Sequence, residues 1–379
     1  MGNAIPVVSA RPAQRENRLG MIEAGRALAA LAVMLFHVDT IVNAHVPHAP
    51  SLPLLVIGER GVDFFFVLSG FIITWVHASD IGQPTQTRRF VLKRLVRIYP
   101  LLWLVAFANV GLNIAVDHEI YPFMKIWTSF TLWPSLAWPS PAAAWTLRHE
   151  MLFYTAFAIF ILSRRIGFAL AAAALAATLW QTGLLLQGGS LPGLAAMLFS
   201  PLNLQFATGC MVAWAFRRFD GRYGPPCLIL GLATLSAFVV AWPWLGLTSR
   251  HALDYQNTRD AVLEIGFAVI FGLVVYGLAD ASNRIRVPQV VLLLGAASYA
   301  IYLVHAPVMG LAGRLLVKLV PASLLALGAG QVVLALAAVC VGVVTHLAFE
   351  KPTGRYLGRL LFASRPRASD NAPLASQAI

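Results

Sequence analysis

The long apolar stretches of this chain limit what it can fold into more than any other feature. About ten segments each hold roughly twenty mostly apolar residues, the length that crosses a bilayer as a helix. Because 59% of the residues are hydrophobic and only 12% are charged, a water-soluble fold could not bury them. The sequence therefore predicts an all-α, polytopic membrane bundle of about ten transmembrane helices. The predicted spans are 21–44, 54–77, 98–116, 141–162, 167–186, 194–216, 226–245, 261–278, 291–316 and 322–349.

The distribution of Lys and Arg predicts the topology of this bundle. If the N-terminus is cytoplasmic, most of these residues fall in cytoplasmic segments. The external segments then carry only Arg60, Lys125, Arg250, Arg259 and Lys318. This bias follows the positive-inside rule with both termini in the cytoplasm. The net charge of +12 therefore reflects topology and contact with membrane lipids, and we expect no nucleic-acid partner.

The sequence predicts a single membrane domain over residues 21–352. A cytoplasmic N-terminal segment, 1–20, precedes it, and a cytoplasmic, partly disordered tail, 353–379, follows it. The three cysteines have no metal-ligand spacing, so we expect neither a metal site nor a disulfide framework.

Two ionisable residues share one face of the first span. Arg26 and His37 are separated by almost three helical turns, which places them on one face roughly 16 Å apart. Ionisable groups at membrane depth are costly and usually serve a function. A snorkelling Arg and a buried His are the alternatives for either residue alone. The aligned pair favours a functional site.

Three further ionisable residues are predicted at similar depth to His37, in the middle-to-outer part of the membrane. They are Asp63, Glu150 and His305. Ser140 is expected to cap the helix that carries Glu150, with Pro141 at its first position. A carboxylate this deep needs an Arg, a His or a proton, so we expect a partner for Glu150 from another helix.

A basic cluster is predicted near the cytoplasmic side. Arg89, Lys93 and Arg97 recur every fourth residue and share a helix face, and Arg94 neighbours Arg97. Such a cluster can bind phosphates through charge-assisted hydrogen bonds. A patch for anionic lipids is an equally good interpretation of the charge alone. Together with Arg26, the cluster indicates an anionic donor that enters from the cytoplasm.

Two other polar or aromatic patterns have both a structural and a functional interpretation. Ser298, Tyr302 and His305 follow the i, i+4, i+7 spacing of one helix stripe, which suits either a site or a polar seam between helices. The segment 117–140 is rich in aromatic residues. An interfacial aromatic belt is its first interpretation, and a groove for a sugar-like acceptor is the second.

Six sequence blocks, in order along the chain, resemble the acyltransferase-3 family of integral membrane O-acyltransferases. The resemblance runs from about residue 21 to 352, and around Glu150 it is closest to the exopolysaccharide O-acetyltransferase branch. The blocks are Arg26 and His37 with ten residues between them, Gly61-Val-Asp63-Phe-Phe-Phe-Val-Leu-Ser69-Gly70-Phe71, Arg94-Leu-Val-Arg97-Ile-Tyr-Pro100, Trp145-Thr-Leu-Arg-His-Glu150-Met-Leu-Phe-Tyr154, Ser298-Tyr-Ala-Ile-Tyr302-Leu-Val-His305 and Glu350-Lys-Pro352.

This resemblance implies transfer of an acyl group from cytoplasmic acyl-CoA, usually acetyl-CoA, to a hydroxyl of an extracytoplasmic or lipid-linked glycan. It implies a multi-pass protein of the bacterial inner membrane that requires no metal. The donor pocket would hold Arg26, and the CoA phosphates would contact Arg94 and Arg97, with Arg89 and Lys93 nearby. The family commonly has Asp at the position of Glu23, and Glu23 keeps an i, i+3 carboxylate for Arg26. No fused hydrolase-like domain is expected, which leaves room for an extracytoplasmic partner protein.

The resemblance further implies that His37 is the general base or an acyl relay. We expect Glu150 or Asp63 to orient His37, and His305 to serve the acceptor. The predicted substrate contacts are Trp145, Tyr302 and Ser69. A proton-coupled transporter or flippase that uses the same buried His, Asp and Glu residues is the alternative function.

Overall fold

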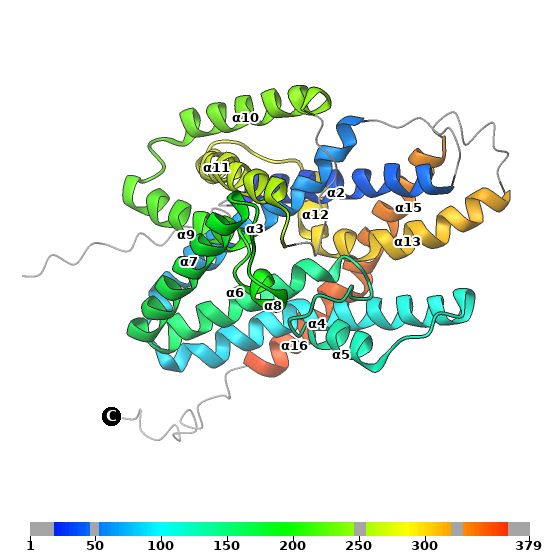
Figure 1. The fold of residues 1–379 in the computed structure, drawn as a ribbon, viewed down its shortest axis with the longest axis horizontal. Helices are drawn as coiled ribbons and strands as arrows, with labels where there is room; N and C mark the ends of the chain where they lie inside the picture. The colour runs from blue at the N-terminus through cyan, green and yellow to red at the C-terminus, as the bar shows by residue number, and fades with distance from the viewer. Residues whose placement is uncertain (1–18, 46–52, 246–254, 320–328, 363–379) are drawn as a thin grey trace, which may run out of the picture.

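The computed structural model describes residues 19–45, 53–245, 255–319 and 329–362. Within these ranges the chain folds into helices and short connections, without a strand, which confirms the all-α prediction (Figure 1). Most of the predicted N-terminal segment and loop residues such as Arg250 lie outside the described ranges. The elements are α2 (Gly20–His45), η2 (Pro53–Arg60), α3 (Gly61–His77), η3 (Ala78–Asp80), α4 (Pro84–Asp117), α5 (Phe123–Thr131), α6 (Ala144–Leu162), α7 (Arg164–Leu186), α8 (Gly193–Leu198), α9 (Leu202–Phe219), α10 (Gly224–Ala241), η4 (Trp242–Trp244), α11 (Thr258–Ala281), α12 (Gln289–Ala296), α13 (Ser298–Leu319), α15 (Ala329–Thr345), η5 (His346–Glu350) and α16 (Lys351–Phe362).

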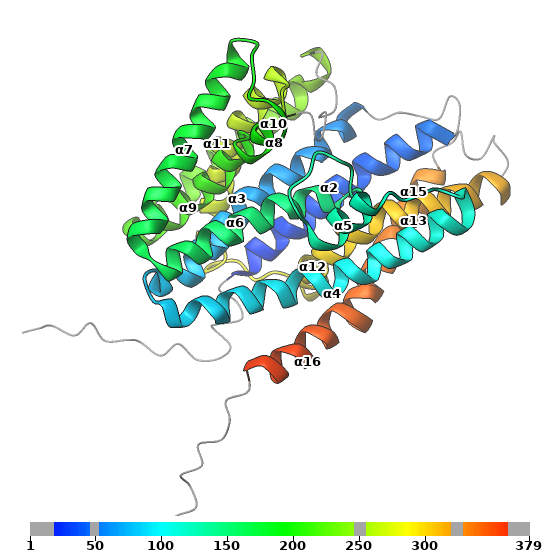
Figure 2. The same ribbon diagram turned by 60° about the horizontal axis from the view of Figure 1, so that its bottom comes forward.

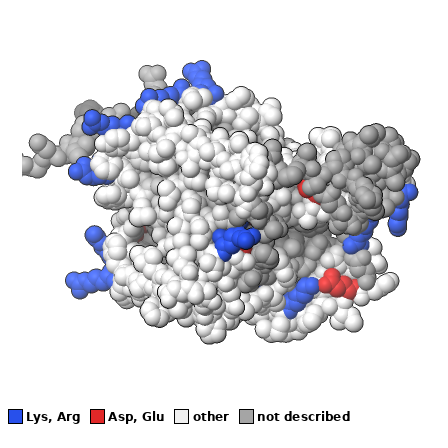
Figure 3. All heavy atoms as spheres, turned by 45° about the horizontal axis from the view of Figure 1, so that its top comes forward, with Lys and Arg blue, Asp and Glu red and all other residues white. Residues whose placement is uncertain are grey.

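Nine helical segments of the described chain are long and apolar enough to cross a membrane. They match nine of the predicted spans. The remaining span is α6, a 19-residue helix whose mean hydropathy is lowered by Arg148, His149 and Glu150. On the face drawn in Figure 3, most Lys and Arg lie toward the two ends, one basic group lies near the centre, and uncharged residues cover most of the described surface between them. A mostly uncharged surface is what the hydrocarbon core of a bilayer requires.

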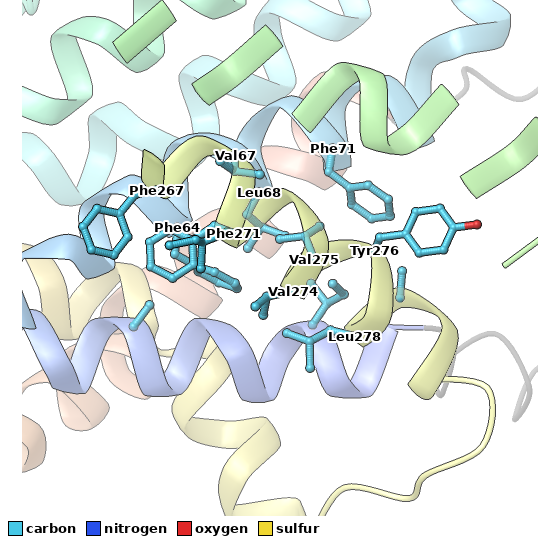
Figure 4. Packing of buried hydrophobic residues seen from close by; sticks show 14 of the residues in the cluster. Phe64, Val67, Leu68, Phe71, Phe267, Phe271, Val274, Val275, Tyr276 and Leu278 are labelled. Carbon is cyan, nitrogen blue, oxygen red and sulfur yellow. The ribbon is translucent and has the colours of Figure 1, made fainter. Parts of the chain in front are cut away.

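The centre of the bundle is formed where α3 packs against α9 and α11. Phe64 and Phe71 of α3 meet Phe271 and Val274 of α11 in the largest buried cluster, part of which Figure 4 shows. On the other side of α3, Gly209 of α9 faces the α3 backbone so closely that a Cβ there would collide with it. Small residues at such crossings let helix backbones approach. This packing fixes the position of α3, which forms one wall of the cavity described below.

The helix α4 is longer than the span predicted for it. It begins at Pro84 and continues to Asp117, because the basic residues 88–97 form its first turns. The hydropathy pattern detected only its apolar part, 98–116. The basic cluster is therefore part of a continuous helix that runs the length of the bundle (Figure 1).

The predicted span 291–316 consists of two helices. The helix α12 ends at Ala296, and α13 begins at Ser298. The backbone of Gly295 packs against the backbone of Glu23 in α2 with no room for a side chain. This contact and the packing of α13 on α2 bring the predicted polar stripe of α13 next to the first helix.

The expected start of α6 was wrong. The helix begins at Ala144, and residues 141–143 form a turn. Ser140 does not cap α6, because its hydroxyl accepts a hydrogen bond from the Asn109 side chain at 2.7 Å. Instead Arg148 holds this segment, since its buried guanidinium donates to the backbone carbonyls of Ser135 (2.7 Å) and Ala137 (2.6 Å).

The segment between α4 and α6 contains α5 and exposes several large aromatic side chains, as expected for an interfacial belt. They are Phe123, Trp127, Trp133 and Trp138. At its start, Lys125 Nζ lies 2.8 Å from Glu119 Oε1. This hydrogen bond, with a smaller contribution from the hydroxyl of Tyr121, lowers the pKa of Glu119.

The last helical run departs from the predicted boundary at residue 353. After α15, the π-helical turn η5 leads into α16, so residues 353–362 of the predicted tail are helical. Figure 2 shows α16 at the edge of the bundle, where it packs against α4. The turn η5 thereby places His346 and Glu350 beside the basic part of α4.

Candidate active site

A cavity of about 400 Å³ lies between α2, α3, α4, α6 and α13, with η5 and the end of α12 completing its wall. It follows α6 from Thr146 to Tyr154, a length of about 12 Å at 1.5 Å per residue. Along α3 it extends from Val62 to Ile73, about 16 Å. The cavity is therefore an elongated channel within the membrane bundle.

One end of the cavity carries three guanidinium groups. Arg26 binds Glu23 at 2.9 Å, which confirms the predicted i, i+3 contact. Arg97 forms an ion pair with Glu350, and its guanidinium lies 5.1 Å from the centre of the Tyr299 ring. Arg94 is the third guanidinium in the lining. This end of the cavity can attract and bind phosphate groups.

Glu350 is fixed from two sides. Its Oε2 lies 2.8 Å from Nδ1 of His346, which also lines the cavity, and its other oxygen accepts from Arg97. The π-helical turn η5 carries both residues. The ion pair therefore joins the last helical run to α4 at the basic end of the cavity.

The middle of the cavity combines an apolar wall with one carboxylate. Phe65, Leu68 and Ile72 come from α3, and Glu150 faces them from α6. Glu150 accepts a hydrogen bond from Tyr154, one turn along the same helix. The expectation of a partner on another helix was wrong, because the i, i+4 spacing of α6 already brings the Tyr154 hydroxyl to the carboxylate.

The far end of the cavity is closed by Tyr302. Its hydroxyl lies 3.0 Å from Thr146 Oγ1 and 3.3 Å from the carbonyl oxygen of Ala143. Ser298 also lines the cavity, and its hydroxyl is buried without a hydrogen-bond partner in the structure. The α13 stripe predicted from sequence thus contributes two hydroxyl groups to the wall.

Two imidazole rings lie beyond Tyr302. The His37 and His305 ring centroids are 4.8 Å apart, and the His305 ring is 5.8 Å from that of Tyr302. His305 is buried and His37 is half-buried. The two histidines therefore meet, as the depth estimate suggested, but neither belongs to the cavity lining, whereas Arg26 does.

Backbone carbonyls determine the tautomers of both rings. Nδ1 of His37 lies 2.9 Å from the carbonyl oxygen of Val33, and Nδ1 of His305 lies 2.5 Å from that of Tyr302. Because a carbonyl can only accept, each Nδ1 carries the proton and donates it. In the neutral rings each Nε2 then has a free lone pair, and that of His305 is buried without a partner. Each ring is thus arranged to act as a base through Nε2.

The two carboxylates expected to orient His37 are engaged elsewhere. Asp63 is fully buried, accepts from Gln205 of α9 and lies 3.8 Å from Arg60. Glu150 binds Tyr154. The carbonyl of Val33 performs the orienting role that was assigned to a carboxylate.

Other predicted site residues divide between the cavity and its surroundings. Ser69 lines the cavity, as Tyr302 does. Trp145 is buried outside the lining, with its ring 6.2 Å from that of His149. Arg89 and Lys93 are exposed on the outer surface of α4, away from the lining formed by Arg94 and Arg97.

Sequence reasoning missed four residues that line or complete the cavity. They are Tyr154, Tyr299, His346 and Glu350. Three of them, Tyr154, Tyr299 and Glu350, lie inside the sequence blocks quoted above, so their position in those blocks was an available signal. His346 lies four residues before Glu350, and only the spacing on a helix could have indicated it.

The fold and the cavity define a multi-pass α-helical membrane protein with a basic, partly apolar internal site. The sequence profile of the acyltransferase domain family matches residues 20–347, and the chain belongs to this family. It is therefore a membrane acyltransferase, and its relatives include a protein named as an O-acetyltransferase.

Three relatives illustrate the range of the family. The exopolysaccharide production protein ExoZ of Rhizobium meliloti (strain 1021) is 29% identical over 84% of this chain and 94% of its own length. The acyltransferase MdmB of Streptomyces mycarofaciens is 27% identical over 95% of this chain and 98% of its own. The putative peptidoglycan O-acetyltransferase YrhL of Bacillus subtilis (strain 168) is 24% identical over 66% of this chain, but the match spans only 44% of YrhL. No solved structure matches the chain.

Proposed function

We propose that this protein transfers an acetyl group from acetyl-CoA to a hydroxyl of a glycan, with His37 as the general base. The observation that supports this most directly is the arrangement of the cavity, which has guanidinium groups at one end and a pair of imidazoles just beyond the other. Both termini would be cytoplasmic, so the basic end would open toward the cytoplasm of a bacterium and the protein would lie in its inner membrane.

The donor would lie along the cavity with its phosphates at the basic end. Arg94 and Arg97 are the proposed phosphate contacts, with Arg26 beside them, because guanidinium groups bind phosphate through paired hydrogen bonds. The elongated, mostly apolar middle is suited to the extended pantetheine arm. The thioester would then lie near Tyr302, next to the histidine pair.

The transfer would proceed by attack of the acceptor oxygen on the thioester carbonyl carbon. Nε2 of His37 removes the hydroxyl proton as the carbon–oxygen bond forms, the carbon–sulfur bond then breaks, and the imidazolium returns the proton to the departing thiolate. A positioned His typically accelerates such a step by roughly 10²–10⁴-fold. The second imidazole, His305, is the proposed contact for the acceptor hydroxyl, because its ring centroid lies 4.8 Å from that of His37.

The acceptor would approach from the side of the histidine pair. The names of two relatives refer to exopolysaccharide production and to peptidoglycan O-acetylation, which favours a glycan or a lipid-linked saccharide. Tyr302 supplies a hydroxyl group at that end of the cavity, and Ser298 supplies one a helical turn closer to the basic end; both are candidates for binding the developing oxyanion. An external partner protein is compatible with this direction of entry.

Release of free CoA thiol from acetyl-CoA by the purified, full-length protein, in the presence of acceptor glycan, tests the reaction. We expect His37→Gln to abolish transfer while the protein still inserts into membranes. The matched control is His118→Asn, since His118 is an exposed loop residue with a left-handed backbone that Asn tolerates. Normal glycan acetylation by His37→Gln would overturn the role of His37.

The donor site has its own test. We expect Arg94→Gln to raise the KM for acetyl-CoA about tenfold or more, because the substitution removes a charge-assisted hydrogen bond to phosphate. The KM for the acceptor should stay constant. An unchanged KM for acetyl-CoA would remove Arg94 from the donor site.

A further inference from the structure

Arg94 differs from the other two guanidiniums of the cavity in its surroundings. Among the described residues, Arg26 and Arg97 each pair with a carboxylate, whereas no carboxylate pairs with Arg94. The guanidinium carbon of Arg94 lies instead 5.4 Å from the ring centre of Phe90 and 5.3 Å from that of Tyr154. Its Nε is buried without a hydrogen-bond partner. Among the described residues, the charge of Arg94 is thus not held in a direct ion pair.

The side chain that does hold Arg94 is His77, at the end of α3. Nη2 of Arg94 lies 3.1 Å from Nε2 of His77. A guanidinium can only donate, so Nε2 of His77 is the acceptor and its proton must be on Nδ1. Nδ1 in turn lies 2.7 Å from Oδ2 of Asp80 and donates to it. Asp80 therefore fixes the neutral tautomer of His77 that can accept from Arg94.

A neutral imidazole acts on Arg94 differently from a carboxylate in the same place. The imidazole fixes the direction of the guanidinium but, unlike a carboxylate, leaves the charge of Arg94 available to an incoming anion. The edge of the buried His77 ring packs on Phe90 with centroids 5.0 Å apart, so the imidazole itself is held in place. The Asp80–His77 pair lies outside the cavity lining, and the hydrogen bond to Arg94 connects it to that lining.

We propose that His77, oriented by Asp80, is a positioning residue that holds Arg94 toward the phosphate groups of the acyl donor without neutralising it. This inference rests on the proposed donor site. It assigns a function to the α3–α4 connection, which otherwise only joins two helices. It also predicts that the effect of His77 is confined to donor binding.

Steady-state kinetics of the full-length protein with acetyl-CoA tests this role. We expect His77→Leu to raise the KM for acetyl-CoA about tenfold, because it removes one hydrogen bond to a charged group. The kcat should change little. His77→Gln keeps an acceptor and should show a smaller rise. The matched control is Gln83→Ala, which removes a hydrogen bond to the Ser79 carbonyl in the same connection. A rise in KM for Gln83→Ala equal to that for His77→Leu would overturn the proposal, because it would show a general effect on the connection.

A double-mutant cycle with Arg94→Gln separates this inference from the proposed function. If His77 acts through Arg94, adding His77→Leu to Arg94→Gln should raise the KM no further. A further tenfold rise in the double variant would overturn the inference. If Arg94→Gln raises the KM for acetyl-CoA and His77→Leu does not, the proposed donor site is supported and the proposed role of His77 is overturned. If Arg94→Gln leaves the KM for acetyl-CoA unchanged, the proposed donor site is overturned, and the role of His77 with it. Should His77→Leu not insert into membranes, Asp80→Asn gives the same test with an expected rise in the same direction.

Discussion

Replacement of Arg60 by Met should destabilise the protein more than the loss of any surface ion pair. Arg60 is only 1% exposed, at the junction of η2 and α3. Its guanidinium lies 3.1 Å from Glu59 and 3.6 Å from Asp260 of α11. The rings of Phe267 and Trp242 lie 5.6 and 6.0 Å from its central carbon. Loss of Arg60 would remove a buried cation that lies within 4.0 Å of the carboxylates of Glu59, Asp63 and Asp260.

The magnitude follows from this burial. Removal of one partner from a buried ion pair typically costs about 3–5 kcal/mol, because the remaining charge stays desolvated. An exposed pair such as Glu119–Lys125 contributes roughly 0–1 kcal/mol. We therefore expect Arg60→Met to lower the free energy of unfolding by several times more than Lys125→Met. Arg60→Lys should lie between them, since Lys keeps the charge but lacks the planar fork.

Unfolding of the purified variants by SDS in mixed micelles, followed by circular dichroism, measures these differences. The double variant Arg60→Met with Glu59→Gln should recover part of the loss, because it also removes the charge of the carboxylate nearest to Arg60. If Arg60→Met unfolds within about 1 kcal/mol of the wild type, the buried cation has no large stabilising role and the reasoning is refuted.

Two further predictions concern packing and pH. Gly209→Ala should prevent correct assembly of α3 on α9, because the added Cβ would collide with the α3 backbone. The control is Gly266→Ala, since a Cβ at Gly266 meets no other atom within 4 Å. If the yield and the unfolding of Gly209→Ala equal those of the wild type, the prediction is contradicted. The lowered pKa of Glu119 means that its bond to Lys125 stabilises the fold above the ordinary Glu pKa and that this stabilisation disappears as pH falls through the lowered value. Glu119→Gln should therefore lower stability at neutral pH by less than about 1 kcal/mol and not at strongly acidic pH, which unfolding at the two pH values checks.

Hydropathy predicted the helices of this fold well wherever apolar residues were uninterrupted. It missed the first turns of α4, because a basic, amphipathic stretch carries no apolar signal even when it continues a spanning helix. It also joined α12 and α13, since the break at Ala297 interrupts no apolar run, and the contact of Gly295 with α2 beside it cannot be read from hydropathy. Such a contact between residues far apart in the sequence has no local signature.

The candidate site was also predictable only in part, because contacts within one helix follow from residue spacing and contacts between helices do not. Helix spacing correctly related Arg26 to Glu23, because both lie on one helix. It did not reveal the partners of Asp63, which include Gln205, 142 residues away in the sequence. Depth along a helix places a group at a level in the membrane but does not say which neighbour it faces. The tautomers of His37 and His305 depend on backbone carbonyls, which residue types alone do not reveal.

The tight crossing of α3 and α9 also limits which helices of the enzyme can move relative to one another. Gly70 and Gly209 bring the two backbones into direct contact, and neither helix can slide or rotate there without steric overlap. We therefore expect α3 and α9 to move as one unit during a catalytic cycle. We expect entry of a bulky nucleotide and departure of the product to use displacement of α4, α6 and α13, which pack less extensively on α3.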